Sequence, residues 1–147
     1  MKETEIKKTV REKYGAIAKQ SGSSCGCTPA ATSCCGSTSG VSNILSKSIG
    51  YSDEDLNSVP EGANLGLGCG NPVALASLKE GETVLDLGSG AGFDCFLASE
   101  KVGATGKVIG VDMTPDMLDK ARENCKKGGY NNVEFRLGEI ENLPVAD

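Results

Sequence analysis

Thr83-Val-Leu-Asp-Leu-Gly-Ser-Gly-Ala-Gly92 is the stretch of this sequence that decides the fold. Its first half is an apolar run typical of a buried strand, and its second half is a glycine-rich turn. The following pattern predicts a helix over 93–102, a strand over 107–112, a helix from Thr114-Pro115 to about Lys127 and a strand over 132–136. This order predicts parallel strands joined by right-handed crossovers, which is an α/β architecture.

The glycine turn also predicts a ligand site. Gly88, Gly90 and Gly92 let the backbone approach a ligand closely, and the helix N-terminus that follows favours anionic groups. Asp112 closes the second strand, 20 residues past Gly92, where a carboxylate can accept both hydroxyls of a ribose. The turn lacks the Gly-x-Gly-x-x-Gly spacing of dinucleotide sites, and Asp86 would suit an ammonium group but repel a pyrophosphate. Both points favour S-adenosylmethionine over NAD.

Two residues after the third strand extend this site. Glu139 and Ile140 stand where the amino group and the ring face of an adenine would be met. The alternative interpretation is that the glycines only allow the helix to pack against the strand and that the acids are solvated.

The chain divides into four segments. Residues 1–20 are expected to form a helix with one apolar stripe, and 21–40 to form a flexible Gly/Ser/Cys-rich loop. Residues 41–80 are expected to be helical and to carry a Gly-Cys-Gly-Asn-Pro turn, followed by a short helix from Val73 to Leu78. Residues 81–147 hold three strands, about half of a doubly wound sheet, so we expect a fragment whose exposed sheet edge can pair with a second copy. The stripe of the first helix consists of Ile6, Val10, Tyr14 and Ile17.

The composition excludes several classes of function. The chain has 147 residues and no His, so mechanisms that need an imidazole base or ligand are excluded. The net charge of −5 argues against a nucleic-acid-binding surface. No apolar run approaches the roughly 20 residues that span a membrane, and the charged N-terminus is not a secretory signal. We therefore expect a cytoplasmic protein without nucleic-acid or membrane partners.

Seven cysteines in a reducing compartment indicate metal, metalloid or redox thiols before a disulfide framework. Four of them lie within eleven residues of the loop, at Cys25, Cys27, Cys34 and Cys35, and Cys69 lies in the Gly-Cys-Gly turn. Neither a Cys-x-Cys nor a vicinal pair has the spacing usual for zinc, so a soft, thiophilic centre with fewer ligands fits better. A redox pair is the open alternative. Two cysteines in expected helices are interpreted as core residues, Cys95 and Cys125.

Six motifs spread along the chain match one known family. They are Val10-Arg-Glu-Lys-Tyr14-Gly15, Cys34-Cys35-Gly36, Leu67-Gly-Cys69-Gly-Asn-Pro72, Val84-Leu-Asp-Leu-Gly-Ser-Gly-Ala-Gly92, Asp112-Met113-Thr114 and Gly138-Glu-Ile-Glu-Asn-Leu-Pro144. On these motifs the chain resembles the N-terminal portion of the bacterial and archaeal arsenite S-adenosylmethionine methyltransferases. The glycine motif alone would indicate only a methyltransferase, whereas the Gly-Cys-Gly-Asn-Pro turn beside it is specific.

The resemblance implies a Rossmann-like class I methyltransferase fold and methyl transfer to thiolate-bound trivalent arsenic. Arsenite would be the substrate and a thiol reductant a partner. The arsenic lone pair attacks the methyl group, so the absence of His is no obstacle. By position, the arsenic ligands would be Cys69 and one thiol of Cys34 and Cys35, with a further cysteine in a strand beyond residue 147. The cofactor contacts would be Asp86, Gly88, Gly90, Asp112, Met113, Glu139 and Ile140.

Two other functions stay open at this point. One is a methyltransferase for a different small molecule, in which the thiols are incidental. The other is a non-catalytic, thiol-rich module that binds a metalloid or zinc.

Overall fold

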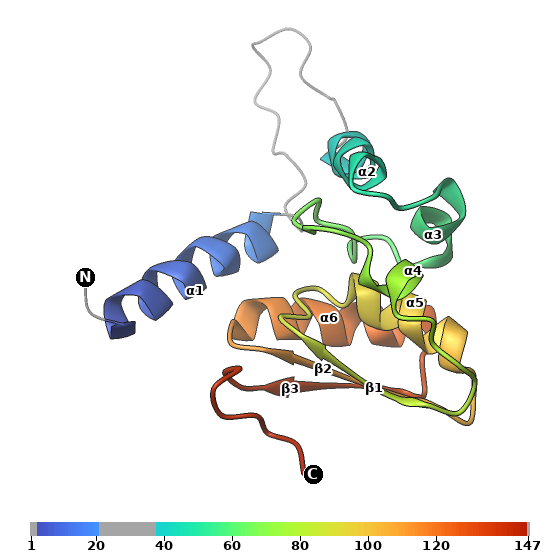
Figure 1. Cartoon of the computed structure of the whole chain (residues 1–147). Helices are drawn as coiled ribbons and strands as arrows, with labels where there is room; N and C mark the ends of the chain where they lie inside the picture. Colours follow the sequence, from blue (N-terminus) through green and yellow to red (C-terminus); the bar gives the residue numbers. More distant parts are fainter. Residues whose placement is uncertain (1–2, 21–37, 147) are drawn as a thin grey trace, which may run out of the picture.

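The computed structural model describes residues 3–20 and 38–146 (Figure 1). Within the described residues, four helices come before the sheet: α1 (Glu3–Gln20), α2 (Thr38–Ser48), α3 (Asp53–Ser58) and α4 (Pro72–Leu75). The α/β portion then follows as β1 (Thr83–Leu87), α5 (Phe93–Val102), β2 (Lys107–Asp112), α6 (Pro115–Gly128) and β3 (Val133–Leu137). Each strand and helix predicted from 83 onward is present, and their boundaries agree within one residue.

The three strands are parallel and lie in the order β1-β2-β3. The register places Asp86 beside Gly110, and Gly110 beside Phe135. Because both crossovers step in the same direction and share one hand, α5 and α6 cover the same face of the sheet (Figure 1). The carboxyl ends of the strands meet at one edge, where the loops that carry the expected ligand site begin.

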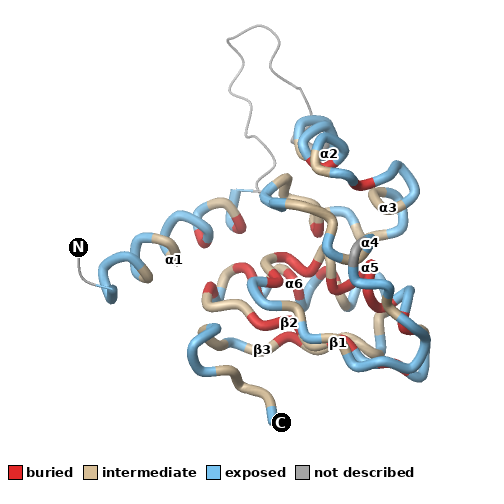
Figure 2. The backbone as a smooth tube through the Cα atoms, viewed as in Figure 1, coloured by how far each residue is buried: buried red, intermediate tan, exposed pale blue. Residues whose placement is uncertain are grey.

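The hydrophobic core lies between this sheet face and the two helices (Figure 2). The ring of Phe96 is fully buried, stacks on Tyr130 with centroids 4.6 Å apart, and meets Phe135 edge-on at 5.9 Å. Val108 of β2 and Leu118 of α6 are also fully buried. Aromatic residues make up 4% of the sequence, so the other large, fully buried side chains of the core are mainly aliphatic, such as Met117 and Leu118.

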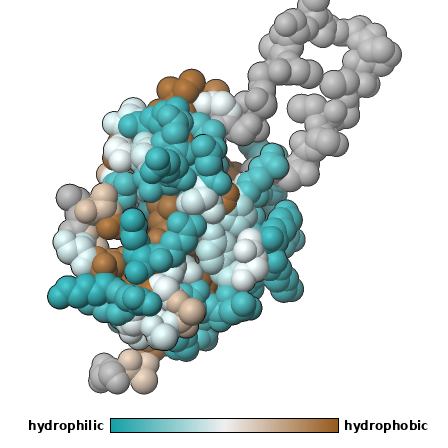
Figure 3. Space-filling view, turned by 90° about the vertical axis from the view of Figure 1, so that its right-hand side faces the viewer, coloured by the Kyte–Doolittle hydropathy of each residue, from teal (hydrophilic) through white to brown (hydrophobic). Residues whose placement is uncertain are grey.

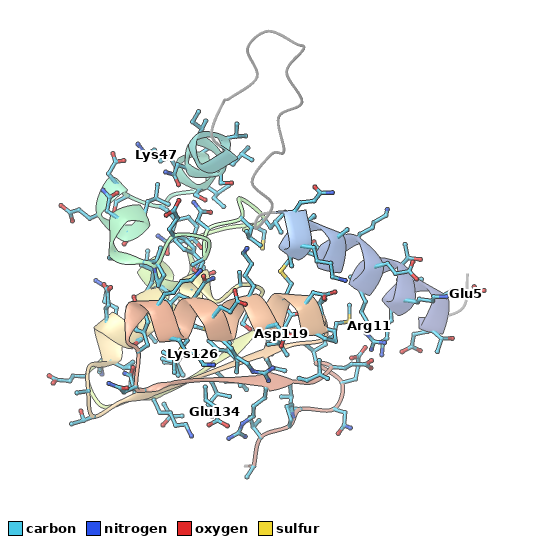
Figure 4. The ribbon with its side chains drawn as sticks, turned by 180° about the vertical axis from the view of Figure 1, so that it is seen from behind. Glu5, Arg11, Lys47, Asp119, Lys126 and Glu134 are labelled. Atoms are coloured by element: carbon cyan, nitrogen blue, oxygen red, sulfur yellow. The ribbon has the colours of Figure 1, made fainter. Side chains whose placement is uncertain are left out.

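The opposite face of the sheet carries no helix within the described part of the chain. Leu85 is 39% exposed and Leu87 50% exposed, although both lie in the central motif of β1. On β3 this face carries Glu134, which pairs with Lys107 at 2.9 Å and with Arg136 at 2.7 Å; Figure 4 shows Glu134 on the side of the sheet away from α6.

Helix α1 packs against the first turn of α6. Gly15 is buried there, and a Cβ at this position would lie 2.5 Å from Oδ2 of Asp116. Lys19 pairs with the same carboxylate at 3.2 Å. The contact therefore uses small residues, Gly15 and Ala18, rather than the predicted apolar stripe, whose Ile6 and Tyr14 remain nearly half exposed.

Two boundaries before the sheet differ from the sequence-based expectation. Helix α2 begins at Thr38, inside the stretch expected to be loop up to residue 40, because Val41, Ile44 and Leu45 follow at helical spacing. These apolar side chains stay exposed, and Figure 3 shows hydrophobic atoms at the upper end of the molecule. Helix α4 ends at Leu75, short of the expected Leu78, because Ser77 takes a left-handed φ of 50°.

Helix α3 begins with a reciprocal capping box. The Asp55 backbone N–H donates to Ser52 Oγ at 3.1 Å, and the Ser52 backbone N–H donates to Asp55 Oδ2 at 2.9 Å. Across the described residues, no helix combines the length and the apolar character that crossing a bilayer would require.

Candidate active site

The glycine turn between β1 and α5 has two functions. Gly88, Gly90 and Gly92 have φ values of 78°, 53° and 93°, a region that favours glycine. A Cβ at Gly88 or Gly90 would meet nothing within 4 Å, so their bare backbone faces open space. A Cβ at Gly92 would lie 2.7 Å from Phe135 Cζ and 2.9 Å from Phe96 Cε2. Two glycines therefore leave room for a ligand, and the third makes room for the core.

Asp112, at the end of β2, holds this turn in place. Its Oδ2 accepts the Gly90 backbone N–H at 2.9 Å, and its Oδ1 accepts the Thr114 backbone N–H at 2.8 Å. An ionised carboxylate offers about four lone-pair positions. Both oxygens thus keep capacity for the ribose hydroxyls that the sequence pattern predicts.

Ser89 supplies a polar atom in need of a partner. Its side chain is buried, and its Oγ is the one buried side-chain N or O atom in the described residues that lacks a hydrogen bond. An unsatisfied buried hydroxyl is costly, so such atoms mark places where a ligand or water completes the structure. Together with the open space over Gly88 and Gly90, this hydroxyl fits a polar ligand at the turn.

A cavity of about 640 Å³ opens above the turn. Its walls are the turn itself, the ends of β2 and β3, the loop over 63–69 and the apolar stripe of α1. The expected site residues that it brings together are Cys69, Gly88, Gly90, Asp112, Met113 and Ile140. The stripe of α1 contributes Ile6, Val10 and Tyr14, which explains why these side chains are not packed on α6.

Asp86 does not line this cavity. It lies on the helix-covered side of β1, where the buried Cys95 thiol donates to its Oδ2 at 3.2 Å. Burial raises the pKa of Asp86, and the Cys95 hydrogen bond opposes that shift. Like Gly92, Asp86 therefore supports the turn from beneath, and a direct ligand contact for either residue stays a prediction.

Glu139 also lies outside the cavity lining. Its carboxylate pairs with the Lys7 ammonium at 2.7 Å and with the Arg11 guanidinium, both on α1. The Lys7 hydrogen bond holds the pKa of Glu139 below its ordinary value. Figure 4 shows Arg11 pointing from α1 toward the end of the sheet. Glu139 therefore anchors the helix that covers the cavity, and its contact with an adenine stays a prediction.

Among the cavity residues that the sequence did not predict, Tyr51 and Asp94 form a hydrogen-bonded pair. The Tyr51 hydroxyl donates to Asp94 Oδ1 at 2.6 Å, and its ring meets Phe93 edge-on with centroids 4.7 Å apart. The pKa of Asp94 is raised to about 6: burial is the main cause, the Asp86 charge adds to it, and the Tyr51 hydrogen bond opposes it. The available signal was an acid two residues past the last glycine, in the first turn of α5.

The thiols fall into three groups. Cys69 is exposed on the cavity wall, in the loop whose Gly68 lies against Tyr51. Cys95 is fully buried and Cys125 half-buried, in keeping with their interpretation as core residues. The predicted ligands Cys34 and Cys35, like Cys25 and Cys27, lie outside the described residues. In the part of the chain that the structure describes, no three His, Cys, Asp or Glu residues gather into a metal site.

Comparisons with known proteins agree with this geometry. Residues 78–147 match a family model described as a methyltransferase domain. Over 147 residues the chain is 55% identical to an arsenite methyltransferase of Halobacterium salinarum, covering 97% of this chain and 37% of that protein. Over 80 residues it is 45% identical to an arsenite methyltransferase of Aquipseudomonas alcaligenes, covering 52% of this chain and 22% of that protein. The chain thus spans 37% of the length of the first curated relative and 22% of the second.

A solved structure supports the architecture. The chain is 31% identical to a SAM-dependent methyltransferase from Aquifex aeolicus, with a TM-score of 0.50, over 72% of this chain and 51% of that one. The predicted Rossmann-like methyltransferase fold is confirmed, with three parallel strands in the described residues. The predicted resemblance to the arsenite methyltransferases is confirmed as well.

Proposed function

We propose that this chain takes part in methyl transfer from S-adenosylmethionine to thiolate-bound trivalent arsenic. It aligns along almost its whole length with an arsenite methyltransferase. One observation carries the proposal. A single cavity is walled both by the open glycine turn with Asp112 and by the thiol of Cys69. A cofactor site and a soft nucleophile-binding group thus share one space.

The residues present fit S-adenosylmethionine. Asp112 would bind the ribose hydroxyls, the bare backbone at Gly88 and Gly90 would lie against the ligand, and the Ser89 hydroxyl would gain a partner. Met113 and Ile140 would offer apolar surface to the adenine ring. When bound, the cofactor supplies a sulfonium methyl group that a soft lone pair can accept.

Cys69 would hold the substrate. Its thiol can displace one hydroxide of arsenous acid, giving an arsenic–sulfur bond and one water. Because a trivalent arsenic atom keeps its lone pair when bound to thiolates, this protein needs no general base to activate it. The other thiolates would come from Cys34, Cys35 and a cysteine beyond residue 147, and a thiol reductant would return the methylated arsenic to the trivalent state.

Two titrations test the proposal on this chain. Calorimetry with S-adenosylhomocysteine should show binding that Asp112→Asn weakens, because an amide replaces the ribose acceptor. Arsenite titration, followed by arsenic–thiolate absorbance, should show a signal reduced by Cys69→Ser and unaffected by the matched control Cys125→Ser. Absence of S-adenosylhomocysteine binding would contradict the cofactor assignment, and an unchanged arsenite signal in Cys69→Ser would contradict the substrate assignment.

Methyl transfer itself is tested by mass spectrometry of arsenic products in the presence of arsenite, S-adenosylmethionine and a thiol reductant. If the protein binds S-adenosylhomocysteine but methylates another small molecule in preference to arsenite, it is a methyltransferase for that molecule and the thiols play no part in the reaction. A cytoplasmic location and pairing with a second copy through a sheet edge remain predictions of the same proposal.

A further inference from the structure

Among the residues that the structure describes, four acidic side chains line the cavity, and three of them already have partners. Glu3 and Glu141 both pair with the Lys7 ammonium, at 3.3 and 3.2 Å. Both oxygens of Asp112 accept backbone N–H groups. The fourth acid, Asp94, is different, because among the described residues no cation lies within ion-pair distance of its carboxylate.

The partner that Asp94 does have orients it. The Tyr51 hydroxyl donates to Oδ1 at 2.6 Å, and within the described part of the chain Oδ2 accepts no hydrogen bond. Tyr51 is itself 4% exposed and fixed by the ring of Phe93. Asp94 therefore presents one unpaired carboxylate oxygen from the first turn of α5, immediately after the glycine turn.

The electrostatics of this position favour a cationic ligand. The groups that face Asp94 are the Tyr51 hydroxyl, the Asp86 carboxylate on β1 and the Cys95 thiol on its own helix. None of them carries positive charge. Burial and Asp86 raise the pKa of Asp94 to about 6, so its ionised form is held at a disadvantage that a nearby ammonium would remove.

We propose that the Asp94 carboxylate, oriented by Tyr51, binds the ammonium of the amino-acid end of S-adenosylmethionine. The sequence suggested that Asp86 would bind this ammonium. Asp86 instead accepts a hydrogen bond from Cys95 and does not line the cavity, so we assign ammonium binding to Asp94. The inference rests on the proposed function, since it names the group that recognises one end of that cofactor.

Two ligands that differ only in that end provide the test. S-adenosylhomocysteine carries the ammonium, and 5′-methylthioadenosine lacks the whole amino-acid portion. Calorimetry should show that Asp94→Asn weakens S-adenosylhomocysteine binding roughly 10- to 30-fold and leaves methylthioadenosine binding unchanged, as expected for loss of a charge-assisted hydrogen bond. The exposed Asp119→Asn variant on α6 serves as the matched control and should change neither affinity.

A proton count gives a second measurement. At pH 6 about half of Asp94 is protonated in the free protein, so binding of S-adenosylhomocysteine should release up to about half a proton per molecule bound. Comparing binding heats in two buffers of different ionisation enthalpy measures that release, which should disappear in Asp94→Asn. Tyr51→Phe should keep the release and weaken S-adenosylhomocysteine more than methylthioadenosine, because the carboxylate remains but loses its orientation.

The outcomes separate the inference from its premise. If the unchanged protein binds neither ligand, the proposed function fails and the inference with it. If it binds both and Asp94→Asn weakens both equally or neither, the inference alone is overturned. A selective loss in Asp86→Asn, with Asp94→Asn unchanged, would overturn it too and restore the assignment made from the sequence.

Discussion

Alanine substitutions at Gly90 and Gly92 should separate ligand binding from folding within one turn. At Gly92 the new Cβ would lie 2.7 Å from Phe135 and 2.9 Å from Phe96, at a φ of 93°. Left-handed strain costs about 1 kcal/mol and overpacking of a core typically costs about 1–3 kcal/mol. Gly92→Ala should therefore lower the free energy of unfolding by about 3 kcal/mol. At Gly90 only the strain applies, because a Cβ there meets nothing within 4 Å.

Urea denaturation followed by circular dichroism measures both variants. With a slope of about 1.5–2 kcal/mol per molar urea, Gly92→Ala should move the midpoint down by about 1.5 M and Gly90→Ala by about 0.5 M. Calorimetry should show the reverse order for S-adenosylhomocysteine, with Gly90→Ala losing affinity because its methyl group occupies ligand space. Equal destabilisation of the two variants, or full ligand affinity in Gly90→Ala, would refute this division of roles.

Three further predictions test other features. The folded-state pKa of Asp94, about 6, lies above its unfolded value of 3.8, so the stability that Asp94 contributes falls as pH rises through that window. As the pH rises from about 4 to 7, the free energy of unfolding of Asp94→Asn should therefore rise by about 2 kcal/mol relative to that of the wild-type protein. Urea titrations at several pH values measure this difference, and a difference that does not change with pH would contradict the prediction. Glu139→Gln weakens the pairs with Lys7 and Arg11, so hydrogen exchange should show faster exchange in α1 with the core unchanged; equal protection of α1 would count against these pairs as its anchor. Ser52→Ala removes the cap of α3 and should cost about 1 kcal/mol by chemical denaturation, and no loss would mean that α3 is held by its packing alone.

The sequence predicted the sheet and part of the site because those signals are local. The apolar run of β1, the glycine spacing and the acid at the end of β2 are each signals within a few residues. The residues that they single out, Gly88, Gly90 and Asp112, line one cavity. The difference between Asp86 and Asp94 is less local. Both acids flank the same turn, and only the packing of α5 on β1 determines that Asp86 meets Cys95 while Asp94 meets Tyr51.

Ion pairs between residues far apart in the sequence could not be predicted from local sequence patterns. Lys7 and Glu139 are separated by 132 positions, and neither residue is marked by periodicity or a motif that links it to the other. Glu139 was therefore interpreted from its place after a strand and from the family resemblance, neither of which points to Lys7. The interpretation of the loop thiols stays a prediction, since those residues lie outside the described ranges.

The ion pair between Lys7 and Glu139 joins two parts of the cavity that are far apart in the sequence. One wall comes from α1 and its anchor from the loop after β3, so during synthesis the cavity closes only after Glu139 has emerged. Loop-closure entropy grows only slowly with loop length, and the contacts that offset it here are the buried Gly15 and Ala18 and ion pairs near the surface. Among the described elements, α1 should therefore detach before the core between α5, α6 and the sheet, which would open the cavity to a ligand while that core stays folded.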